Sequence, residues 1–335
     1  MSVPETASAL WRARLSLSTG LGSYFGGMWR PRREAVSKRA AGRYIGRMTD
    51  DKKTGTPRDS HYARLRRAHR RGEEGDKPFA RPRPKPGLPA ALPADGLVRL
   101  YGLHTVRAAL DNPARRIRRM LATRNALSRL GVAEPSALPF PVEIVEPREI
   151  DRIVGGEAVH QGVLVEAEPL IPKRLSALSD TPLVLVLDQV TDPHNVGAIL
   201  RSGVAFGVGA VVTTARHSPA ESGVLAKAAS GALEHIDMIE VRNLAEALEE
   251  LHEAGFETIG LDSEGPAELE QTFSGNRIAL VLGAEGKGLR QKTRTTVTAL
   301  ARLDMPGAIR SLNVSNAAAI ALYAAHRHLS GGGAR

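Results

Sequence analysis

The chain contains two continuous apolar runs, Leu183-Val184-Leu185-Val186-Leu187 and Ile278-Ala279-Leu280-Val281-Leu282. Runs of this kind are typical of strands that are buried on both faces of a parallel sheet. Strand-like and helix-like segments alternate around them. The other predicted strands are 210–213, 236–241, 258–262 and 299–303, and the predicted helices are 196–205, 222–229, 244–254 and 314–328. This alternation predicts an α/β domain over residues 182–330, with helices on both faces of a parallel sheet.

Polar loops follow three of these strands, after Leu187, Leu282 and Leu303. Ligands in such sheets bind beyond the carboxyl ends of the strands, so the three loops predict one shared site. The third loop has more polar residues than the cap of the following helix needs. Its side chains are Ser311, Asn313, Ser315 and Asn316, and either Asn313 or Ser315 is a suitable cap.

Several kinds of site are excluded by spacing and composition. The segment Gly283–Leu289 lacks the spacing of a Walker phosphate loop, and Gly207-Val208-Gly209 lacks the third glycine of a dinucleotide fingerprint. No metal-ligand spacing and no nucleophile elbow occurs in the sequence, and the chain has no cysteine. No apolar run is long enough to span a membrane. What remains is an organic ligand held against glycine-rich backbone, with one arginine, one glutamate and several amides nearby.

A smaller α/β unit precedes this domain, over residues 98–168. Its predicted strands are 98–101, 117–121, 142–145 and 162–166, and its predicted helices are 104–110, 125–130 and 147–154. Four arginines mark the second strand, namely Arg115, Arg116, Arg118 and Arg119. They form either a solvated edge or a contact surface for RNA phosphate. Residues 169–181 show no period and predict a linker that allows the two domains to move.

The first 97 residues carry the basic character of the chain. They hold 21 Lys and Arg against 9 Asp and Glu, whereas residues 98–335 hold 25 and 27. Such a segment predicts a disordered tail, either merely solvated or acting as a polyanion-binding arm. Residues 1–47 are rich in arginine and resemble an organelle transit peptide, but Met48 is an equally suitable start.

Three motifs resemble those of the SpoU/TrmH family of RNA ribose methyltransferases, and they come in the family's order. They are Asp192-Pro193-His194-Asn195-Val196-Gly197-Ala198-Ile199-Leu200-Arg201-Ser202, Gly283-Ala284-Glu285-Gly286-Lys287-Gly288 and Ser311-Leu312-Asn313-Val314-Ser315. A second resemblance, carried by Tyr101-Gly102-Leu103-His104-Thr105-Val106 with His160-Gln161-Gly162, is to the family's ribosomal-protein-like substrate-binding domain. This two-domain layout is closest to the members that methylate a guanosine of 23S rRNA, the RlmB type.

The resemblance implies a trefoil-knotted SPOUT fold, S-adenosylmethionine as cofactor, no metal, and a cytoplasmic homodimer whose subunits complete each other's sites. The cofactor would lie against Gly283, Leu303 and Leu312. The alternative for Gly283 is a purely structural role in a strand-to-loop turn. The polar catalytic set would be Asn195, Arg201, Glu285, Ser311 and Asn313.

Two roles stay open for Arg201. The family's arginine is proposed to activate the ribose 2′-hydroxyl, but a guanidinium is almost never neutral. We therefore weigh equally an electrostatic role, in which Arg201 holds RNA phosphate and stabilises the forming alkoxide. Glu285 would cap a helix, pair with Arg201 or order Asn195, and we favour the organising role. His194 is interpreted as a loop residue without a catalytic role.

One departure from the family pattern lies before the third motif, where Asp304 stands in place of an expected proline. It bears on the cofactor contacts of 303–306 more than on the activity. Two rival functions are a tRNA methylase of the same family and a non-catalytic RNA-binding assembly factor. The separate domain at 98–168 favours rRNA over tRNA, and the complete polar set argues against lost catalysis.

Overall fold

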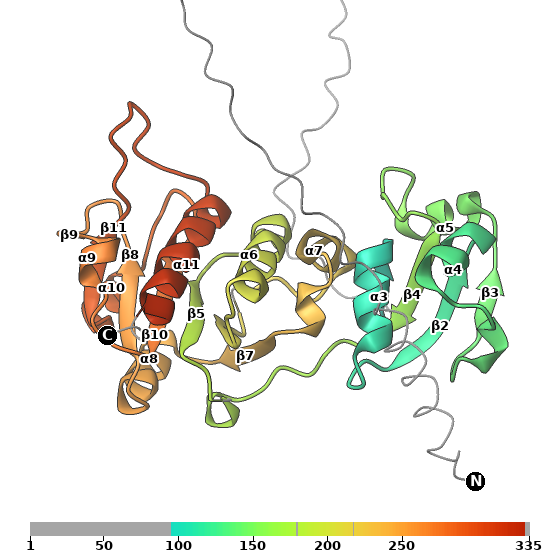
Figure 1. Cartoon of the computed structure of the whole chain (residues 1–335), viewed down its shortest axis with the longest axis horizontal. Coiled ribbons are helices and arrows are strands. Elements are labelled where there is room, and N and C mark those ends of the chain that lie inside the picture. Colours follow the sequence, from blue (N-terminus) through green and yellow to red (C-terminus); the bar gives the residue numbers. More distant parts are fainter. Residues whose placement is uncertain (1–94, 179, 217, 332–335) are drawn as a thin grey trace, which may run out of the picture. The chain divides into compact units, whose positions relative to one another are not determined.

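The computed structural model describes residues 95–178, 180–216 and 218–331 (Figure 1). The predicted basic tail, residues 1–97, lies outside the described residues except for 95–97. The described residues belong to one compact unit and contain two sheets. The first strand begins at Val98, where the sequence predicts it.

The smaller domain has a four-stranded sheet in the order β1-β4-β2-β3. Its strands pair antiparallel except for β2 and β3, which run parallel. The elements are β1 (Val98–Tyr101), α3 (Leu103–Asp111), β2 (Ile117–Ala122), α4 (Arg124–Leu130), a 3-10 turn (Pro135–Ala137), β3 (Val142–Ile144), α5 (Pro147–Val154) and β4 (Val163–Ala167). Helix α5 starts where predicted, because Pro147 occupies its first turn and Glu146 and Glu149 form a capping box.

The larger domain has a seven-stranded sheet in the order β7-β6-β5-β10-β8-β11-β9, and every pair in it is parallel. Its first half contains β5 (Leu183–Asp188), α6 (Pro193–Ala205), β6 (Ala210–Thr214), α7 (Gly223–Ala229), a 3-10 turn (Ala232–Glu234) and β7 (Asp237–Val241). Its second half contains α8 (Leu244–Glu253), β8 (Glu257–Leu261), β9 (Ala267–Glu268), α9 (Leu269–Thr272), β10 (Ile278–Gly283), α10 (Gln291–Thr296), β11 (Ala299–Arg302) and α11 (Val314–Gly331). The predicted parallel α/β sheet is confirmed, and the knot stays a prediction.

Strand β5 shows why this sheet must be covered on both faces. Successive side chains of a strand point to opposite faces. Leu185 packs in a core cluster with α6 and α11, and Val184 and Val186 pack in a second cluster with α8. All the residues of β5 are buried, so the continuous apolar run has the cause that the sequence predicts.

Helix α6 begins at Pro193, three residues before the predicted start. The carboxylate of Asp192 accepts a hydrogen bond from the backbone N–H of His194 at 3.2 Å, and Pro193 supplies the first turn. His194 and Asn195 therefore lie in the first turn of α6 and not in a loop. The sequence also missed β9, α9 and α10, which are short or carry no apolar period.

Segment 169–181 differs from the free linker expected. The backbone N–H of Lys173 donates to the carbonyl of Met238 at 2.8 Å, and the carbonyl of Lys173 accepts from the backbone N–H of Glu240 at 3.2 Å. A 3-10 turn follows at Leu175–Ala177. Backbone pairing to β7 thus fixes this segment along the edge of the larger sheet.

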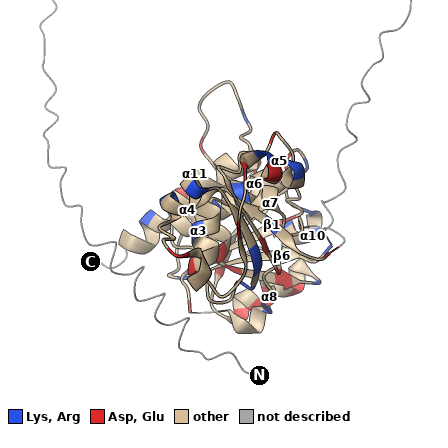
Figure 2. Cartoon of the chain, turned by 90° about the vertical axis from the view of Figure 1, so that its right-hand side faces the viewer, with Lys and Arg blue, Asp and Glu red and all other residues tan. Residues whose placement is uncertain are grey.

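Acidic and basic side chains are interspersed over the described residues (Figure 2). One clear acidic region is helix α8, whose exposed positions include Glu246, Glu249, Glu250 and Glu253. Repulsion between these carboxylates and phosphate makes α8 an unsuitable surface for RNA.

Candidate active site

A cavity of about 760 Å³ lies at the carboxyl ends of the parallel strands. The loops after β10 and β11 and the first turn of α11 form much of its wall. Six of the predicted site residues line it, namely Gly283, Glu285, Leu303, Ser311, Leu312 and Asn313. Because all strands of the sheet run parallel, segments far apart in the sequence meet at this edge.

A chain of hydrogen bonds joins the three predicted loops. The amide of Asn195 donates to the Glu285 carboxylate at 3.4 Å, and its carbonyl oxygen accepts from the Asn313 amide at 3.0 Å. The donor and acceptor of Asn195 are therefore both used, one toward each neighbouring loop. Among the described residues no ion pair joins Glu285 to Arg201, so the bond to Asn195 supports the organising role of Glu285.

Asn313 is the residue that caps α11. Its side-chain oxygen accepts from the backbone N–H of Ser315 at 2.9 Å and from the Ser315 hydroxyl at 2.6 Å. The amide of Asn313 remains directed at Asn195, so one side chain both begins the helix and connects the loops. Ser311 and Leu312 are exposed at the cavity wall.

The loop after β10 is shaped by its glycines. Gly286 and Gly288 have φ of 76° and 64°, a region that favours glycine. A Cβ at Gly283 would collide with the backbone of Gly288, because Ala284 and Gly288 pair across the loop. Glycine is therefore required at 283 because the loop folds back on itself. This favours the alternative that Gly283 is a glycine because of the strand-to-loop turn. Its backbone still lines the cavity.

The same loop is anchored to β5 by a buried acid. Asp188 is fully buried and accepts from the backbone N–H of Arg290 at 2.9 Å and from its Nε at 2.6 Å. A carboxylate without solvent needs such charge-assisted partners. This pair fixes the position of the loop relative to β5.

Several cavity residues were missed by the sequence reasoning. Asp262 and Arg294 form an ion pair at the wall, and Glu264 lies beside them. Asp262 follows β8, so the rule used for the other strand ends would have found it. Arg294 comes from the unpredicted helix α10 and carried no signal.

The departure at position 304 leaves its neighbours in the site. Leu303 and Met305 line the cavity, and the Met305 carbonyl accepts from the Arg310 guanidinium at 3.0 Å. Asp304 is exposed.

Arg201 does not share this cavity. It lies six residues after Asn195 on α6, which places it about 9 Å along the helix axis and about 120° around it. Arg201 lines a second hollow of about 480 Å³ together with His104 and Arg107 of α3 and His235. One chain therefore does not bring Arg201 to the other predicted catalytic residues.

The four arginines near β2 divide into two kinds. The side chains of Arg116 and Arg118 are 80% and 62% exposed, and both lie within ion-pair distance of Glu168. Arg119 is partly exposed and bonds Glu166 at 2.7 Å, and this hydrogen bond raises the pKa of the guanidinium. Each of these three has surface from which phosphate can be reached.

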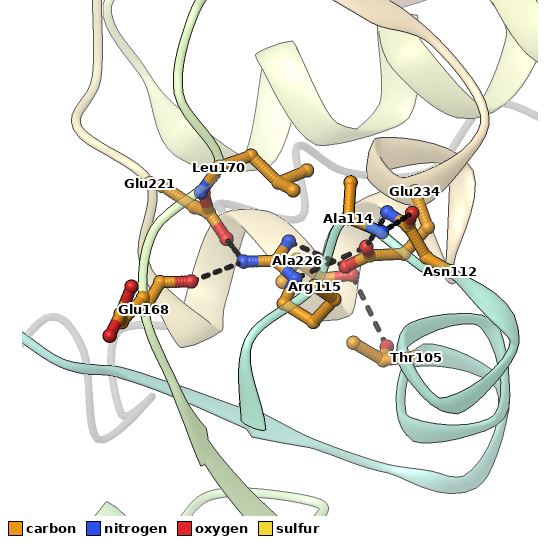
Figure 3. Close-up of polar contacts among 9 residues, drawn as sticks. All are labelled: Thr105, Asn112, Ala114, Arg115, Glu168, Leu170, Glu221, Ala226 and Glu234. Carbon is orange, nitrogen blue, oxygen red and sulfur yellow. Dashed lines mark hydrogen bonds and ion pairs between the residues drawn. The ribbon is translucent and has the colours of Figure 1, made fainter. Parts of the chain in front are cut away.

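The prediction that Arg115 contacts RNA is wrong. Its side chain has no exposed surface, and its guanidinium is bonded by Glu221 and Glu234 (Figure 3). The run of four arginines does not indicate which of them is buried. The burial of Arg115 depends on residues more than a hundred positions away.

The cavity fits a nucleoside-like cationic cofactor. Its volume lies in the usual range for small-molecule sites. Leucines 261, 303 and 312 supply apolar wall for a base, and Glu264 and Glu285 supply negative charge for a cation. Among the described residues there is no group of three or more His, Asp or Glu side chains placed to hold a metal ion. No described helix is long and apolar enough to cross a membrane.

Two family models match the chain over the domains described above. Residues 182–323 match the SpoU rRNA methylase family, and residues 99–172 match the RNA 2′-O ribose methyltransferase substrate-binding family. The matched ranges correspond to the larger and the smaller sheet with their helices.

Curated relatives cover both domains. The chain is 39% identical over 241 residues to a 23S rRNA (guanosine-2′-O-)-methyltransferase RlmB of Ralstonia nicotianae, a match covering 69% of this chain and 96% of that relative. It is 35% identical over 249 residues to RlmB of Escherichia coli K12, covering 69% of this chain and 98% of the relative.

A solved structure has the same fold. The SpoU methyltransferase AviRb from Streptomyces viridochromogenes superposes with a TM-score of 0.61 at 20% identity, covering 71% of this chain and 91% of that one. The site geometry, the family models and the near-complete coverage of these relatives lead to one conclusion: the chain belongs to the SpoU rRNA methylase family.

Proposed function

We propose that this protein transfers a methyl group from S-adenosylmethionine to a ribose 2′-hydroxyl of RNA, at a guanosine of 23S rRNA. The observation that carries the proposal is the joining of three segments that follow strand ends by Asn195, Glu285 and Asn313. The guanosine and 23S rRNA are taken from the names of relatives that this chain covers almost completely. A ribosomal RNA substrate supports the proposal that the enzyme works in the cytoplasm.

S-adenosylmethionine supplies a methyl group on a sulfonium, which is already an activated leaving group. The work left to the protein is positioning and the exclusion of water. Leu303 and Leu312 provide apolar wall, and the backbone at Gly283 lies beside them. Asn195 keeps the loops of Glu285 and Asn313 in register, so that the wall is formed before the substrate arrives.

The 2′-hydroxyl must lose its proton to solvent water as its oxygen bonds the methyl carbon and the bond between that carbon and sulfur breaks. In our proposal the guanidinium of Arg201 holds the RNA phosphate and stabilises the negative charge that develops on that oxygen. This role does not require a neutral guanidinium. It agrees with the exposure of Arg201, which leaves its donors available to an RNA ligand.

Arg201 reaches the cavity from a second copy of the chain in this proposal. The separation of Arg201 from the cavity along and around α6 supports a site shared between the subunits of a homodimer. Helix α11, which packs against α6, exposes Ile320 and Tyr323 by 46% and 55%. Exposed apolar side chains on a helix that packs against α6 suit an interface between copies.

Subunit complementation tests the shared site. Arg201→Ala and Asn313→Ala chains are each expected to be inactive as homodimers. After unfolding and joint refolding, mixed dimers contain one site with both residues intact, so about a quarter of the wild-type rate should return. No recovery from mixed dimers of verified composition would mean that both residues act from the same chain.

The reaction itself is tested with labelled S-adenosylmethionine and ribosomal RNA, followed by mapping of ribose methylation in total RNA from a deletion strain. The expected result is one lost mark at a guanosine of 23S rRNA. A lost mark in tRNA would replace the substrate, and no transfer by the intact dimer would favour a non-catalytic assembly factor.

A further inference from the structure

A buried polar cluster joins the substrate-binding domain to the methyltransferase domain. Arg115, from the turn between α3 and β2, lies between Glu221, just before α7, and Glu234, just after it (Figure 3). We name these three residues the Arg115 cluster. The side chains of Arg115, Glu221 and Glu234 are 0%, 12% and 1% exposed. None of them lines the cofactor cavity, so the proposed reaction leaves this cluster unexplained.

The cluster uses every nitrogen of the guanidinium. Arg115 bonds Glu234 through Nη2 at 2.6 Å and Nε at 3.2 Å, a two-point contact that fixes the plane of both groups. Its Nη1 donates to Glu221 at 2.6 Å and to the backbone carbonyl of Glu168 at 3.0 Å. Lysine cannot reproduce this planar fork.

The carboxylates are held by further donors from the smaller domain and the linker. The Asn112 amide donates to Glu234 at 2.7 Å, and the Leu170 backbone N–H donates to Glu221 at 2.8 Å. Burial raises the pKa of Glu221. The start of the 169–181 segment is therefore tied to the methyltransferase domain.

Helix α7 packs closely against the smaller domain beside this cluster. Ala226 of α7 belongs to the smaller domain's hydrophobic core, and its carbonyl accepts from the Thr105 hydroxyl at 3.3 Å. A Cβ at Gly223 would lie 2.7 Å from the ring of Tyr101, and a Cβ at Gly231 would lie 2.9 Å from the Cβ of Ala108. Such contacts leave no room for the two domains to slide past one another.

The domain contact forms the groove in which Arg201 lies. His104 and Arg107 of α3 line one side of this groove, and Arg201 of α6 lines the other. A shift of the smaller domain would change the distance between these walls. RNA that contacts both walls would then bind only the fraction of molecules whose walls are in register, so its apparent affinity would fall.

We propose that Arg115 is a positioning residue, which locks the substrate-binding domain to α7 and so keeps the two walls of the groove that contains Arg201 in register. The proposal rests on the RNA methyltransferase function for its kinetic consequence only. The locking itself is a property of the protein without ligand.

Interdomain distances test the locking directly. The chain has no cysteine, so Ile144→Cys in β3 and Glu249→Cys in α8, both exposed, take up two spin labels without background. Labelled chains are diluted with unlabelled chains to suppress distances between subunits. The native Arg115 should give one narrow distance distribution, Arg115→Ala a broad one, and Arg115→Lys an intermediate one. A narrow distribution in Arg115→Ala would overturn the proposal.

Kinetics supply the second measurement. For Arg115→Ala we expect the KM for RNA to rise about tenfold, with kcat and the Kd for S-adenosylmethionine within about threefold of wild type. Arg152→Ala, an exposed arginine of the same domain, is the matched control and should leave all three unchanged. An unchanged KM for RNA in Arg115→Ala would contradict the positioning role.

If Arg115→Ala does not fold, the distance distribution and the KM for RNA are measured on Arg115→Lys instead. Wild-type values of both in Arg115→Lys would overturn the proposal. In the double variant with Glu234→Ala, the effect on KM should not exceed that of Arg115→Ala alone, because the two residues act through one contact. Additive effects would contradict this. Inactivity of the wild-type protein toward RNA would refute the proposed function and leave the distance result intact.

Discussion

The cofactor cavity and the Arg115 cluster both contain acids and arginine, but they differ in burial and in bond length. At the cavity, Glu285 is exposed and its bond from Asn195 is 3.4 Å long. In the cluster, Arg115 has no exposed side-chain surface and two of its bonds are 2.6 Å long. Half-exposed groups keep donors and acceptors available for ligands, whereas buried groups must be satisfied by the protein itself. Burial thus distinguishes groups that are available to a ligand from groups that hold two domains together.

The largest expected effect on stability is that of Arg115→Ala. Removing the guanidinium leaves two buried carboxylates without their partner, which costs about 3–5 kcal/mol. Urea denaturation followed by circular dichroism measures the loss, with Arg152→Ala expected to stay within about 0.5 kcal/mol of wild type. A loss of free energy of unfolding below about 3 kcal/mol would mean that water enters the cluster of the variant. The cluster would then resemble the cavity more than its burial indicates.

Arg201→Ala should have the largest effect on catalysis without affecting stability. Loss of one electrostatic stabiliser of a developing charge lowers kcat by about 10²–10³-fold. The affinity for S-adenosylmethionine, measured by calorimetry, should stay within about twofold, because Arg201 lies outside the cavity. Arg242→Ala, another exposed arginine, is the control. An equal loss of cofactor affinity would place Arg201 with the cavity residues.

Asn313 offers a pair of variants that separates its two bonds. Asn313→Ala removes the cap of α11 and should cost about 1 kcal/mol. Asn313→Asp keeps the oxygen that caps Ser315 and loses the amide that bonds Asn195, so it should retain stability while methyl transfer falls. Full activity of Asn313→Asp would show that the link between the loops is dispensable.

The smallest effect is expected at the exposed arginines. Arg118→Ala removes one phosphate contact and should lower the salt dependence of RNA binding by about one unit of slope. The same change at the exposed Arg152 should leave the slope unchanged. Equal slopes for Arg118→Ala and wild type, measured by filter binding at several salt concentrations, would assign Arg118 to the solvated edge.

The core of the fold was predictable because its signals are local. The apolar runs 183–187 and 278–282 predicted strands covered on both faces, and both are buried. Loops at the ends of such strands gather at one edge, so most of the cavity followed from the order of the elements. The cap Asp192 and the proline after it also carried a local signal, and reading them would have placed the start of α6 correctly.

Other features had no local signal. Arg294 comes from α10, a helix without an apolar period, and the pairing of Lys173 with β7 is a contact distant in sequence. The glycine at 283 was expected to admit a ligand, whereas the loop's own backbone fills the space. In each case the position of the residue, or the need for glycine, depends on contacts with residues that are not its neighbours in the sequence.

The sequence by itself determined the strand order along the chain, the family motifs and the polar set at the strand ends, because these depend on neighbouring residues and on fixed spacing. Only the tertiary structure decided which of four adjacent arginines meets solvent. Arg115 and Arg116 are consecutive, but the fold brings Glu221 and Glu234, 106 and 119 residues away, around the first of them. Burial is a property of what packs against a residue, and for Arg115 that partner is another domain.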